Sequence, residues 1–277
     1  MKLYLPQTSI YAPKTRICIT TTPLCALASF TLTLCNVAQL QRSSNPAVLD
    51  PFAGSCATLL AAAHITSMPS ASTSGSLSSS SISNNDMPTA TKLGTHNEGG
   101  CRSIGIEFLH NGYVNRDNII KDFETRNLEP PMKIIRGDCL SPEVRDLARN
   151  TVGGGGGFDA IITDPPYGIR EAMSGSTTSS SSSDSSVPNG EGELMEAIPP
   201  LTQLFYVMGE DRANGTPLLK QGGRLVAFVP VRKGETLEEC LPAAEAVEGA
   251  GLKMEGEGKE QVLSDILSRW LVSFVCE

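Results

Sequence analysis

The sequence predicts an α/β fold built on a doubly wound, mostly parallel β-sheet. Short apolar stretches alternate with helix-forming stretches along the chain, which is the order that a parallel sheet covered by helices requires. Several of the apolar stretches are followed directly by an acidic residue or by a glycine-containing turn. Folds of this kind bind ligands at the carboxyl ends of their strands, so these turns are where function is expected.

The expected elements are short and regular. Strands are predicted at residues 47–49, 103–108, 132–135, 158–163 and 224–230, with a closing pair around 253–258 and 270–276. Helices are predicted at residues 56–64, 112–126, 142–150, near 193–208, and 237–250. Trp270, the single tryptophan of the chain, is expected in the core.

Low-complexity stretches interrupt this pattern. Ser-rich tracts occupy residues 67–85 and 174–190, and residues 153–157 are all glycine. Such sequences bury too little apolar surface to offset the entropy of ordering the chain. We therefore expect one catalytic domain at residues 46–277, with insertions at about 66–100 and 173–192, preceded by an N-terminal segment of residues 1–45.

Composition restricts the classes of partner. A net charge of −8 and a pI of about 5.0 argue against a free-standing nucleic-acid binder, because binding phosphates requires a surplus of Lys and Arg on some face. An RNA substrate would need a local basic patch or a partner protein. The 8 cysteines include no Cys-x-x-Cys pair and the 3 histidines form no ligand pattern, so we predict reduced thiols and no metal site.

The N-terminal segment is open to several interpretations. The first 49 residues contain no acidic residue and include an apolar stretch at residues 24–40. A secretory signal needs basic residues directly before a leucine-rich run, and a spanning helix needs about 20 apolar residues without the Thr, Asn and Gln present here. A transit peptide fits the absence of acids better. A helix packed on the sheet of a cytoplasmic protein is the interpretation we prefer, for a reason given below.

Four acidic residues stand at the ends of four successive predicted strands. They are Asp50, Glu107, Asp138 and Asp164. Each one alone is a common surface acid or turn residue, and an Asp-Pro pair alone is an ordinary turn. Because buried sheet edges rarely collect acids by accident, the four together predict a single crevice.

The first three acids have physical roles if the ligand is a nucleoside that carries a sulfonium group. Gly54 allows the backbone to approach the ligand closely, and Asp50 either counters the positive methionine end or orients the turn. Glu107 is placed to bind ribose hydroxyls, and Asp138 to accept a hydrogen bond from the adenine amine. We therefore predict an S-adenosylmethionine site. It comprises Asp50, Phe52, Gly54, Glu107, Asp138 and Cys139.

The fourth acid begins the tetrapeptide Asp164-Pro165-Pro166-Tyr167, whose members are the predicted catalytic residues. A ring-attached amine is a poor nucleophile because its lone pair is delocalised. If the Asp164 carboxylate and the Pro165 carbonyl accept its two hydrogens, the nitrogen becomes pyramidal and its lone pair points at the methyl group. Pro166 restrains the backbone, and Tyr167 offers a ring face to the target base.

The tetrapeptide lies in a longer run that resembles a known family. Residues 158–171, FDAIITDPPYGIRE, are similar to the signature of the Trm-eleven family, the catalytic subunits of eukaryotic tRNA guanosine-N(2)-methyltransferases acting on position ten. Residues 50–54, 222–226 and 267–272 also match, and residues 20–40 resemble the helix before the family's first strand. The resemblance covers the catalytic domain and implies the class I, S-adenosylmethionine-dependent, Rossmann-like methyltransferase fold.

The resemblance also implies a partner, and it has departures. Members of the family work with a small zinc-binding activator subunit, which we expect to dock on the sheet edge. We expect no counterpart of the family's RNA-binding THUMP region within these residues, which would affect substrate capture. Gly54-Ser55-Cys56 replaces the usual Gly-x-Gly turn, so we expect weaker cofactor binding, and the 174–190 insertion directly follows the catalytic loop.

The leading hypothesis is methylation of the exocyclic amine of a guanosine in tRNA. A second hypothesis keeps the chemistry and changes the substrate to an adenine or a glutamine amide. A third, from a different class, is a truncated and non-catalytic remnant that binds the activator or the cofactor without turnover. The length of the signature through Arg170 and Glu171 favours guanosine.

Overall fold

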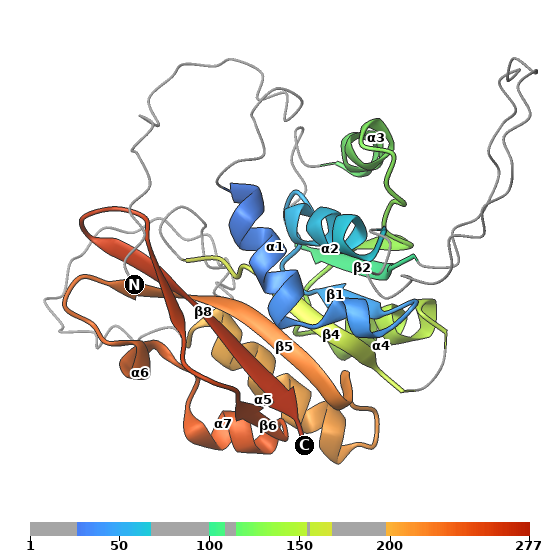
Figure 1. Ribbon diagram of the computed structural model, residues 1–277. Helices are drawn as coiled ribbons and strands as arrows, with labels where there is room; N and C mark the ends of the chain where they lie inside the picture. The colour runs from blue at the N-terminus through green and yellow to red at the C-terminus, as the bar shows by residue number, and fades with distance from the viewer. Residues whose placement is uncertain (1–26, 68–99, 109–114, 154–155, 168–197) are drawn as a thin grey trace, which may run out of the picture.

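Five parallel strands form the centre of the molecule, in the order β3-β2-β1-β4-β5 (Figure 1). Next to β5 lies β8, which is antiparallel to it, and β6 and β7 pair with β8. The strands are β1 (Ala47–Asp50), β2 (Arg102–Glu107), β3 (Lys133–Arg136), β4 (Phe158–Thr163), β5 (Leu219–Arg232), β6 (Leu252–Met254), β7 (Lys259–Val262) and β8 (Leu267–Cys276). This is the doubly wound, mostly parallel α/β sheet that the sequence predicts.

The computed structural model describes residues 27–67, 100–108, 115–153, 156–167 and 198–277. The expected insertion at 173–192 and almost all of the one at 66–100 lie outside the described residues. So do residues 1–26, which bear on the targeting interpretations. No helix within the described ranges combines the length and the apolar character that crossing a membrane requires.

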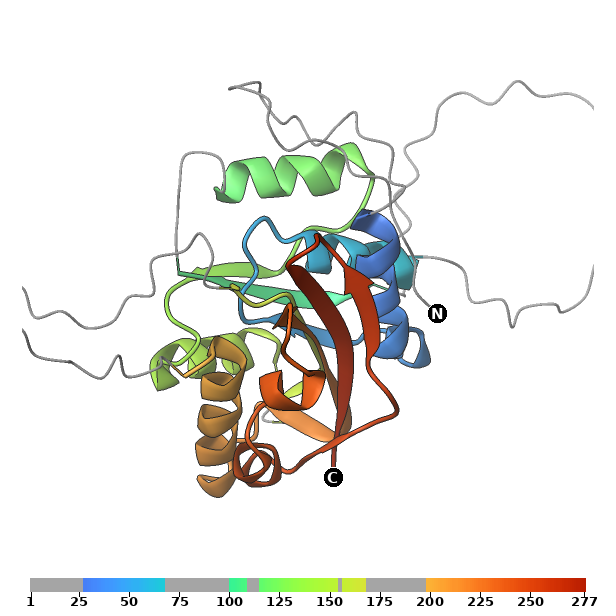
Figure 2. The same ribbon diagram turned by 90° about the vertical axis from the view of Figure 1, so that its left-hand side faces the viewer.

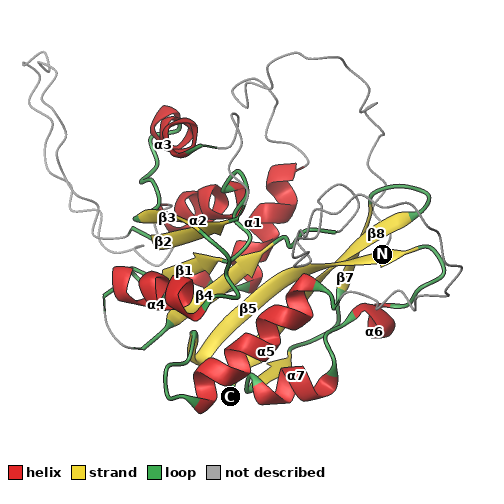
Figure 3. Ribbon diagram, turned by 180° about the vertical axis from the view of Figure 1, so that it is seen from behind, coloured by secondary structure: helices red, strands yellow, loops and turns green. Residues whose placement is uncertain are grey.

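Helices cover both faces of the sheet (Figures 2 and 3). On one face α1, α2 and α3 contribute to one buried cluster, and on the other face α4, α5 and α7 contribute to a second. The helices are α1 (Leu27–Val37), α2 (Ala57–Ser67), α3 (Arg116–Thr125), α4 (Pro142–Thr151), α5 (Pro200–Ala213), α6 (Leu237–Cys240) and α7 (Ala244–Gly249), with a short 3-10 helix at Leu40–Arg42.

The central strand β5 shows why the sheet has two cores. Its alternate residues point to opposite faces, as the period of two in a β-strand dictates. Leu225 and Ala227 belong to the cluster under α5, whereas Val226 and Phe228 belong to the cluster under α1 and α2. A strand buried on both sides therefore reads as a continuous apolar run in the sequence.

The N-terminal helix is the packed helix that the sequence analysis preferred. In α1, Leu34 and Cys35 are fully buried in the same cluster as residues of α2 and β5. An amphipathic helix gains most of its stability from such packing, because short helices are marginal on their own. Residues 27–37 therefore belong structurally to the catalytic domain, although they lie before residue 46.

One predicted helix is wrong. Residues 237–250 were expected to form one helix, but the structure has two short ones, α6 and α7. Pro242 lies between them, and it lacks the N–H that a continuing helix needs. Leu241, which precedes it, is extended at φ −67° and ψ 153°, as a residue before proline prefers. Trp270 is half-buried and packs against the core from its margin.

A buried ion network joins α4 to α5. The Arg145 guanidinium donates two hydrogen bonds to the Asp211 carboxylate, at 2.8 and 2.9 Å. Arg149 donates a further one to Asp211 at 2.8 Å, and Arg145 also reaches the backbone carbonyl of Leu140 at 2.6 Å. Burial works to raise the pKa of Asp211, but the hydrogen bonds from the two arginines outweigh it and hold that pKa below its usual value.

Candidate active site

The four acids end neighbouring strands along one edge of the sheet. Because β3, β2, β1 and β4 are parallel and adjacent, their carboxyl ends place Asp138, Glu107, Asp50 and Asp164 in a row. The surroundings of the four side chains differ. Asp50 is buried, Asp138 is exposed, and Glu107 and Asp164 lie between these extremes. The row is therefore one site with several chemical environments.

Asp50 ties together the first strand, the following turn and the fourth strand. Its carboxylate accepts hydrogen bonds from the backbone N–H of Phe52 at 3.1 Å, from the hydroxyl of Thr163 at 2.9 Å, and from the hydroxyl of Thr58. Burial raises the pKa of Asp50 to about 7, although these hydrogen bonds act to lower it. Of the two roles foreseen for Asp50, orientation of the turn is the one these contacts support.

The turn after β1 is held by the acid at the end of β2. The backbone N–H of Gly54 donates to Oε2 of Glu107 at 2.6 Å, and the N–H of Ala53 donates to the carbonyl of Ile106 at 2.9 Å. Gly54 has φ +48°, in the left-handed region that favours glycine. Phe52, the predicted cofactor contact, is half-exposed in this turn. The structure thus brings the predicted residues of β1 and β2 into direct contact.

Cys56 occupies the place where the sequence analysis expected a glycine, and its backbone has the matching conformation, with φ +61°. Its side chain is fully buried and belongs to the core cluster beneath α2. The sulfur lies 3.4 Å from where a Cβ on Gly105 would stand, and burial raises the pKa of its thiol strongly. Because the thiol points into the core, its position gives no support to the expectation that it crowds the cofactor.

The loop after β3 presents an exposed carboxylate. Asp138 accepts a hydrogen bond from the N–H of Leu140 at 2.9 Å, and its own carbonyl accepts from the N–H of Ser141 at 3.0 Å, which shapes the loop before α4. Cys139 is buried, and burial raises the pKa of its thiol to about 12. A Cys139 contact with a ligand at this edge would therefore come from its backbone.

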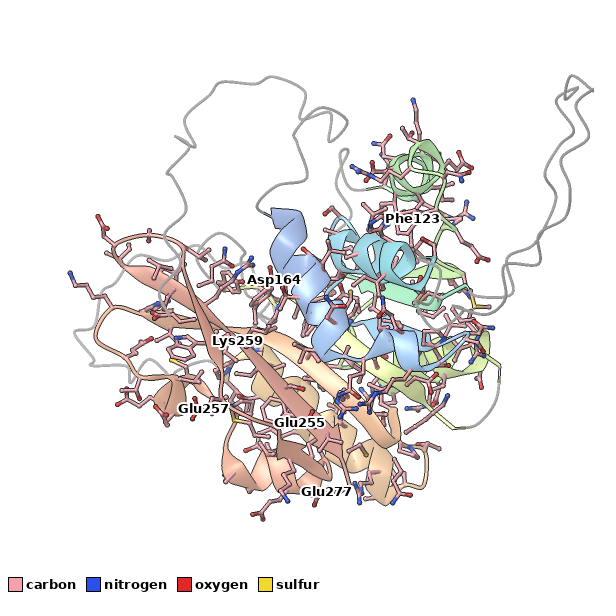
Figure 4. All side chains as sticks on the ribbon, viewed as in Figure 1. Phe123, Asp164, Glu255, Glu257, Lys259 and Glu277 are labelled. Atoms are coloured by element: carbon pink, nitrogen blue, oxygen red, sulfur yellow. The ribbon has the colours of Figure 1, made fainter. Side chains whose placement is uncertain are left out.

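Asp164 lies at the end of β4 and is engaged at both carboxylate oxygens. Oδ2 accepts a hydrogen bond from Nη1 of Arg269 at 2.7 Å, and Oδ1 accepts one from the hydroxyl of Tyr167. Figure 4 labels Asp164 above the long β5–β8 pair. Its side chain is 37% exposed, whereas that of Arg269 is 10% exposed. Pro165 is buried, and Pro166 and Tyr167 are half-buried.

Arg269 is a site residue that the sequence reasoning missed. Its Nε donates to Oε1 of Gln261 on β7 at 2.8 Å, and its guanidinium carbon lies 3.8 Å from the ring centre of Phe228 on β5. Nη1 also donates to the Tyr167 hydroxyl at 3.2 Å. The one available signal was the match of residues 267–272 to the family, which showed that the segment mattered without showing what it contacts.

The curated proteins found to be similar to the chain all carry the same description. The matches to "tRNA (guanine(10)-N(2))-methyltransferase TRMT11" include the mouse protein, 41% identical over 88 residues, and the chicken protein, 36% identical over 117 residues. The human protein is 40% identical over 92 residues. The chain is similar to part of these tRNA methyltransferases.

The extent of this similarity is limited. The matched stretches make up 31% of the chain and 18% of the mouse protein, and 42% of the chain and 23% of the chicken protein. The chain thus matches less than a quarter of the length of these relatives. No protein-family model matches the chain.

Two solved structures described as methyltransferases or methylases have a similar fold. A putative class I S-adenosylmethionine-dependent methyltransferase from Listeria monocytogenes covers 90% of the chain and 60% of its own length, at 11% identity and a TM-score of 0.45. An rRNA methylase from Streptococcus thermophilus covers 91% of the chain and 97% of its own length, at 10% identity and a TM-score of 0.44. Both likenesses are distant and concern the fold alone.

The cysteines of the described residues are free thiols, at Cys35, Cys56, Cys101, Cys139, Cys240 and Cys276. In those same parts of the chain, no group of three or more His, Cys, Asp or Glu side chains is arranged to hold a metal ion. The described groups at the row of strand ends are carboxylates, backbone groups and the Tyr167–Arg269 pair.

Proposed function

We propose that the chain is an S-adenosylmethionine-dependent methyltransferase that methylates the exocyclic amine of a guanosine in tRNA. The observation that carries this proposal is the Asp164-Pro165-Pro166-Tyr167 loop at the end of β4, whose carboxylate is partly exposed beside the turn after β1. The similarity to tRNA (guanine(10)-N(2))-methyltransferases supports the choice of tRNA and guanosine. The same proposal places the protein in the cytoplasm.

The residues at the strand ends fit the cofactor. Gly54 has the backbone conformation of a turn that a ligand can approach closely, and the half-exposed Glu107 carboxylate stands beside it. Asp138 is exposed at the next strand end, with Cys139 behind it. Glu107 would hold the ribose hydroxyls and Asp138 the adenine amine. When bound, S-adenosylmethionine supplies a methyl group on a positively charged sulfur.

The tetrapeptide acts on the target amine. Asp164 accepts one amine hydrogen and the Pro165 carbonyl accepts the other, so the nitrogen loses its planarity and its lone pair becomes available. Burial of Pro165 fixes the position of that carbonyl, and Pro166 limits the backbone that follows. Tyr167 supports the base with its ring. Because these acceptors are in place before the reaction, they stabilise the transition state more than the ground state.

Substrate capture requires help that the overall charge of the chain does not provide. With a net charge of −8, the chain as a whole repels a polyanion. By resemblance to the family, we propose a small zinc-binding activator subunit as partner, docked on the sheet edge. In the described part of the sheet, β3 pairs with β2 alone, and Met132 before β3 and Phe108 after β2 are 52% and 53% exposed. An open strand edge with apolar neighbours is a suitable docking surface.

The test is transfer of a labelled methyl group from S-adenosylmethionine to unmodified tRNA transcripts, with and without the activator subunit. We expect transfer with the activator, and N(2)-methylguanosine as the product after digestion and mass spectrometry. Adenine-containing oligonucleotides and a glutamine-containing peptide serve as competing substrates. Transfer to one of these instead would change the substrate and keep the chemistry, whereas no transfer to any substrate would favour a non-catalytic remnant.

A further inference from the structure

The two partners of the Asp164 carboxylate are anchored very differently. Arg269 belongs to β8, which is paired on one side with β5 and on the other with β7. Its guanidinium is fixed by Gln261 at 2.8 Å and by the Phe228 ring at 3.8 Å, in addition to Asp164 itself. Tyr167 lies three residues after Asp164 in the same loop and is half-buried, and its hydroxyl accepts one longer hydrogen bond from Nη1 of Arg269, at 3.2 Å.

The planar guanidinium has a geometry that suits its position. Arginine carries five N–H donors in a rigid fork, so one side chain can hold a carboxylate and a neighbouring amide in fixed relation. Arg269 does this with Nη1 on Asp164 and Nε on Gln261, while its face stacks on Phe228. Lysine offers a single ammonium and cannot make the same set of contacts.

The partners of the carboxylate bear on how the target amine reaches it. Each carboxylate oxygen can accept two hydrogen bonds, and on Asp164 the Tyr167 hydroxyl holds one position at Oδ1 and Nη1 of Arg269 holds one at Oδ2. The Arg269 side chain is 10% exposed and approaches from the core, whereas the carboxylate itself is 37% exposed. An incoming amine can replace the tyrosine hydroxyl more readily than it can replace a charged, buried and three-way anchored arginine.

We propose that Arg269 is a positioning residue that fixes the Asp164 carboxylate through Oδ2, and that the target amine binds by displacing the Tyr167 hydroxyl from Oδ1. Displacement releases the hydroxyl from the loop's own acid and frees the ring to support the base. Arg269 then holds Asp164 in the same place before and after substrate binds. This inference rests on the proposed methyl transfer, because it assigns roles within that reaction.

The experiment is steady-state methyl transfer to an unmodified tRNA transcript by the full chain with its activator. Arg269→Met should lower kcat by about ten- to a hundredfold, because displacing the Asp164 carboxylate by about 1 Å or less from its reactive position has effects of this order. The KM for tRNA and the affinity for S-adenosylmethionine should stay within about twofold. Arg269→Lys should recover part of kcat because it restores the charge beside Asp164.

Two further variants separate positioning from folding. Gln261→Met keeps the arginine and removes one anchor, so kcat should fall by about three- to tenfold even if Arg269→Met proves unstable. Arg224→Met is the matched control, because Arg224 pairs with Glu255 at 2.9 Å on the same sheet but outside the row of strand ends. Equal kcat for the Arg224, Arg269 and Gln261 variants would overturn the role of Arg269. The role of Arg269 would also be overturned if the losses in kcat among the variants simply paralleled their losses in melting temperature.

Tyr167→Phe tests the displacement step. Without the hydroxyl the amine has no competitor at Oδ1, so kcat/KM for tRNA should rise by about two- to tenfold, the value of one net hydrogen bond. A fall in kcat/KM would show that the hydroxyl assists the reaction, and it would overturn displacement. If the wild type transfers no methyl group, both the proposed function and this role are excluded. If the wild type is active and Arg269→Met is equally active, only the role is excluded.

Discussion

Asp211 and Asp164 are both held by arginine, and their comparison separates a structural site from the proposed reactive one. Asp211 receives three hydrogen bonds from Arg145 and Arg149, and its side chain is 7% exposed. Asp164 receives one from Arg269 and one from Tyr167, and its side chain is 37% exposed. The first carboxylate has cations as partners at both oxygens. The second keeps one oxygen on a neutral hydroxyl that can be exchanged.

The difference between Asp211 and Asp164 shows how an arginine–carboxylate pair can either stabilise the fold or position a reactive group. A buried carboxylate with two cationic partners stabilises the contact between α4 and α5 and leaves no position for a ligand. A carboxylate fixed from the buried side by one cation has a known direction and an accessible oxygen. The sheet supplies the rigid support in the second case, because Arg269 lies on a strand with neighbours on both sides.

The largest effect is expected from breaking the structural site. Asp211→Ala leaves the buried Arg145 guanidinium without a carboxylate and leaves Arg149 with Asp146 alone, which should lower the free energy of unfolding by about 3–5 kcal/mol. Chemical denaturation measures this change. Glu255→Ala is the control, because its pair with Arg224 is exposed on the Glu255 side and should contribute at most about 1 kcal/mol. Equal effects of the two substitutions would contradict the proposal that Asp211 stabilises the contact between α4 and α5.

Substitution of Asp164, in the proposed reactive site, should lower the rate of methyl transfer and leave the stability of the protein nearly unchanged. Asp164→Ala should lower kcat by about a hundredfold to a thousandfold while cofactor affinity and melting temperature change little, because the lost interaction is made in the transition state. Asp164→Asn should be nearly as damaging, since it keeps one acceptor oxygen and loses the charge. Labelled-methyl transfer and calorimetry measure the two quantities, and a variant with wild-type turnover would exclude this loop as catalytic.

Asp50 provides a third case, a buried carboxylate held by hydroxyls and a backbone N–H. Its pKa of about 7 in the folded protein lies above the ordinary aspartate value of 3.8, so the folded state binds the proton more tightly. The stability from this group is therefore complete below pH 4 and lost as pH rises towards 7, by on the order of 4 kcal/mol.

Asp50→Asn should remove this pH dependence, because the amide is neutral throughout and Thr58 can reverse its hydrogen bond. Unfolding curves at several pH values test it, and a wild-type profile in the variant would argue against titration of Asp50. Cofactor affinity measured on the same variant separates its two predicted roles. Weaker binding would support a direct charge contact with the ligand, and unchanged binding would support orientation of the turn.

Glu107 is expected to have a moderate effect on the cofactor. Glu107→Ala removes the acceptor of the Gly54 N–H as well as the predicted ribose contact. Affinity for S-adenosylmethionine should weaken by about 1.5–3 kcal/mol, the range for hydrogen bonds to a charged group. Calorimetry measures it, and Glu129→Ala, a change outside the row of strand ends, should leave it unaltered. Unchanged affinity in Glu107→Ala would remove this residue from the site.

The smallest effect is expected at Cys56. Cys56→Gly relieves the left-handed backbone at φ +61° but also removes a fully buried side chain, so the two contributions should nearly cancel, within about 1 kcal/mol of stability. Stronger cofactor binding, as the sequence alone suggests, would show that the side chain crowds the turn. Equal or weaker binding would show that the turn has adapted to Cys56.

The sequence predicts the elements whose signal is local. The strand expected at residues 158–163 is β4 as observed, because the apolar residues 160–162 lead into Thr163 and then Asp-Pro-Pro. The break at Pro242 was equally visible, and the expectation of one long helix gave the flanking helix-forming residues too much weight. The sequence also predicted that the four acids would lie in a row, because neighbouring parallel strands end at the same edge of a sheet.

The parts of the site that sequence reasoning missed depend on distant pairings. Arg269 and Asp164 are 105 residues apart, and Arg145 and Asp211 are 66 apart. Nothing in the local pattern around an arginine on an apolar strand shows which carboxylate it will meet. The hydrogen bond from Tyr167 to Asp164 is local, but it competes with the stacking role assigned to the ring, and only coordinates show which contact forms without a substrate.

The position of β8 determines when, during synthesis and folding, the contact between Arg269 and Asp164 can form. This strand enters the sheet between β5 and β6, and it comes after both in the chain. During synthesis Asp164 leaves the ribosome before Arg269, so the proposed catalytic loop exists for a time without this contact. Pairing of β8 with β5 brings Arg269 to the Asp164 carboxylate. If Asp164 is the catalytic acid, the final pairing of the sheet and the positioning of that acid are a single step.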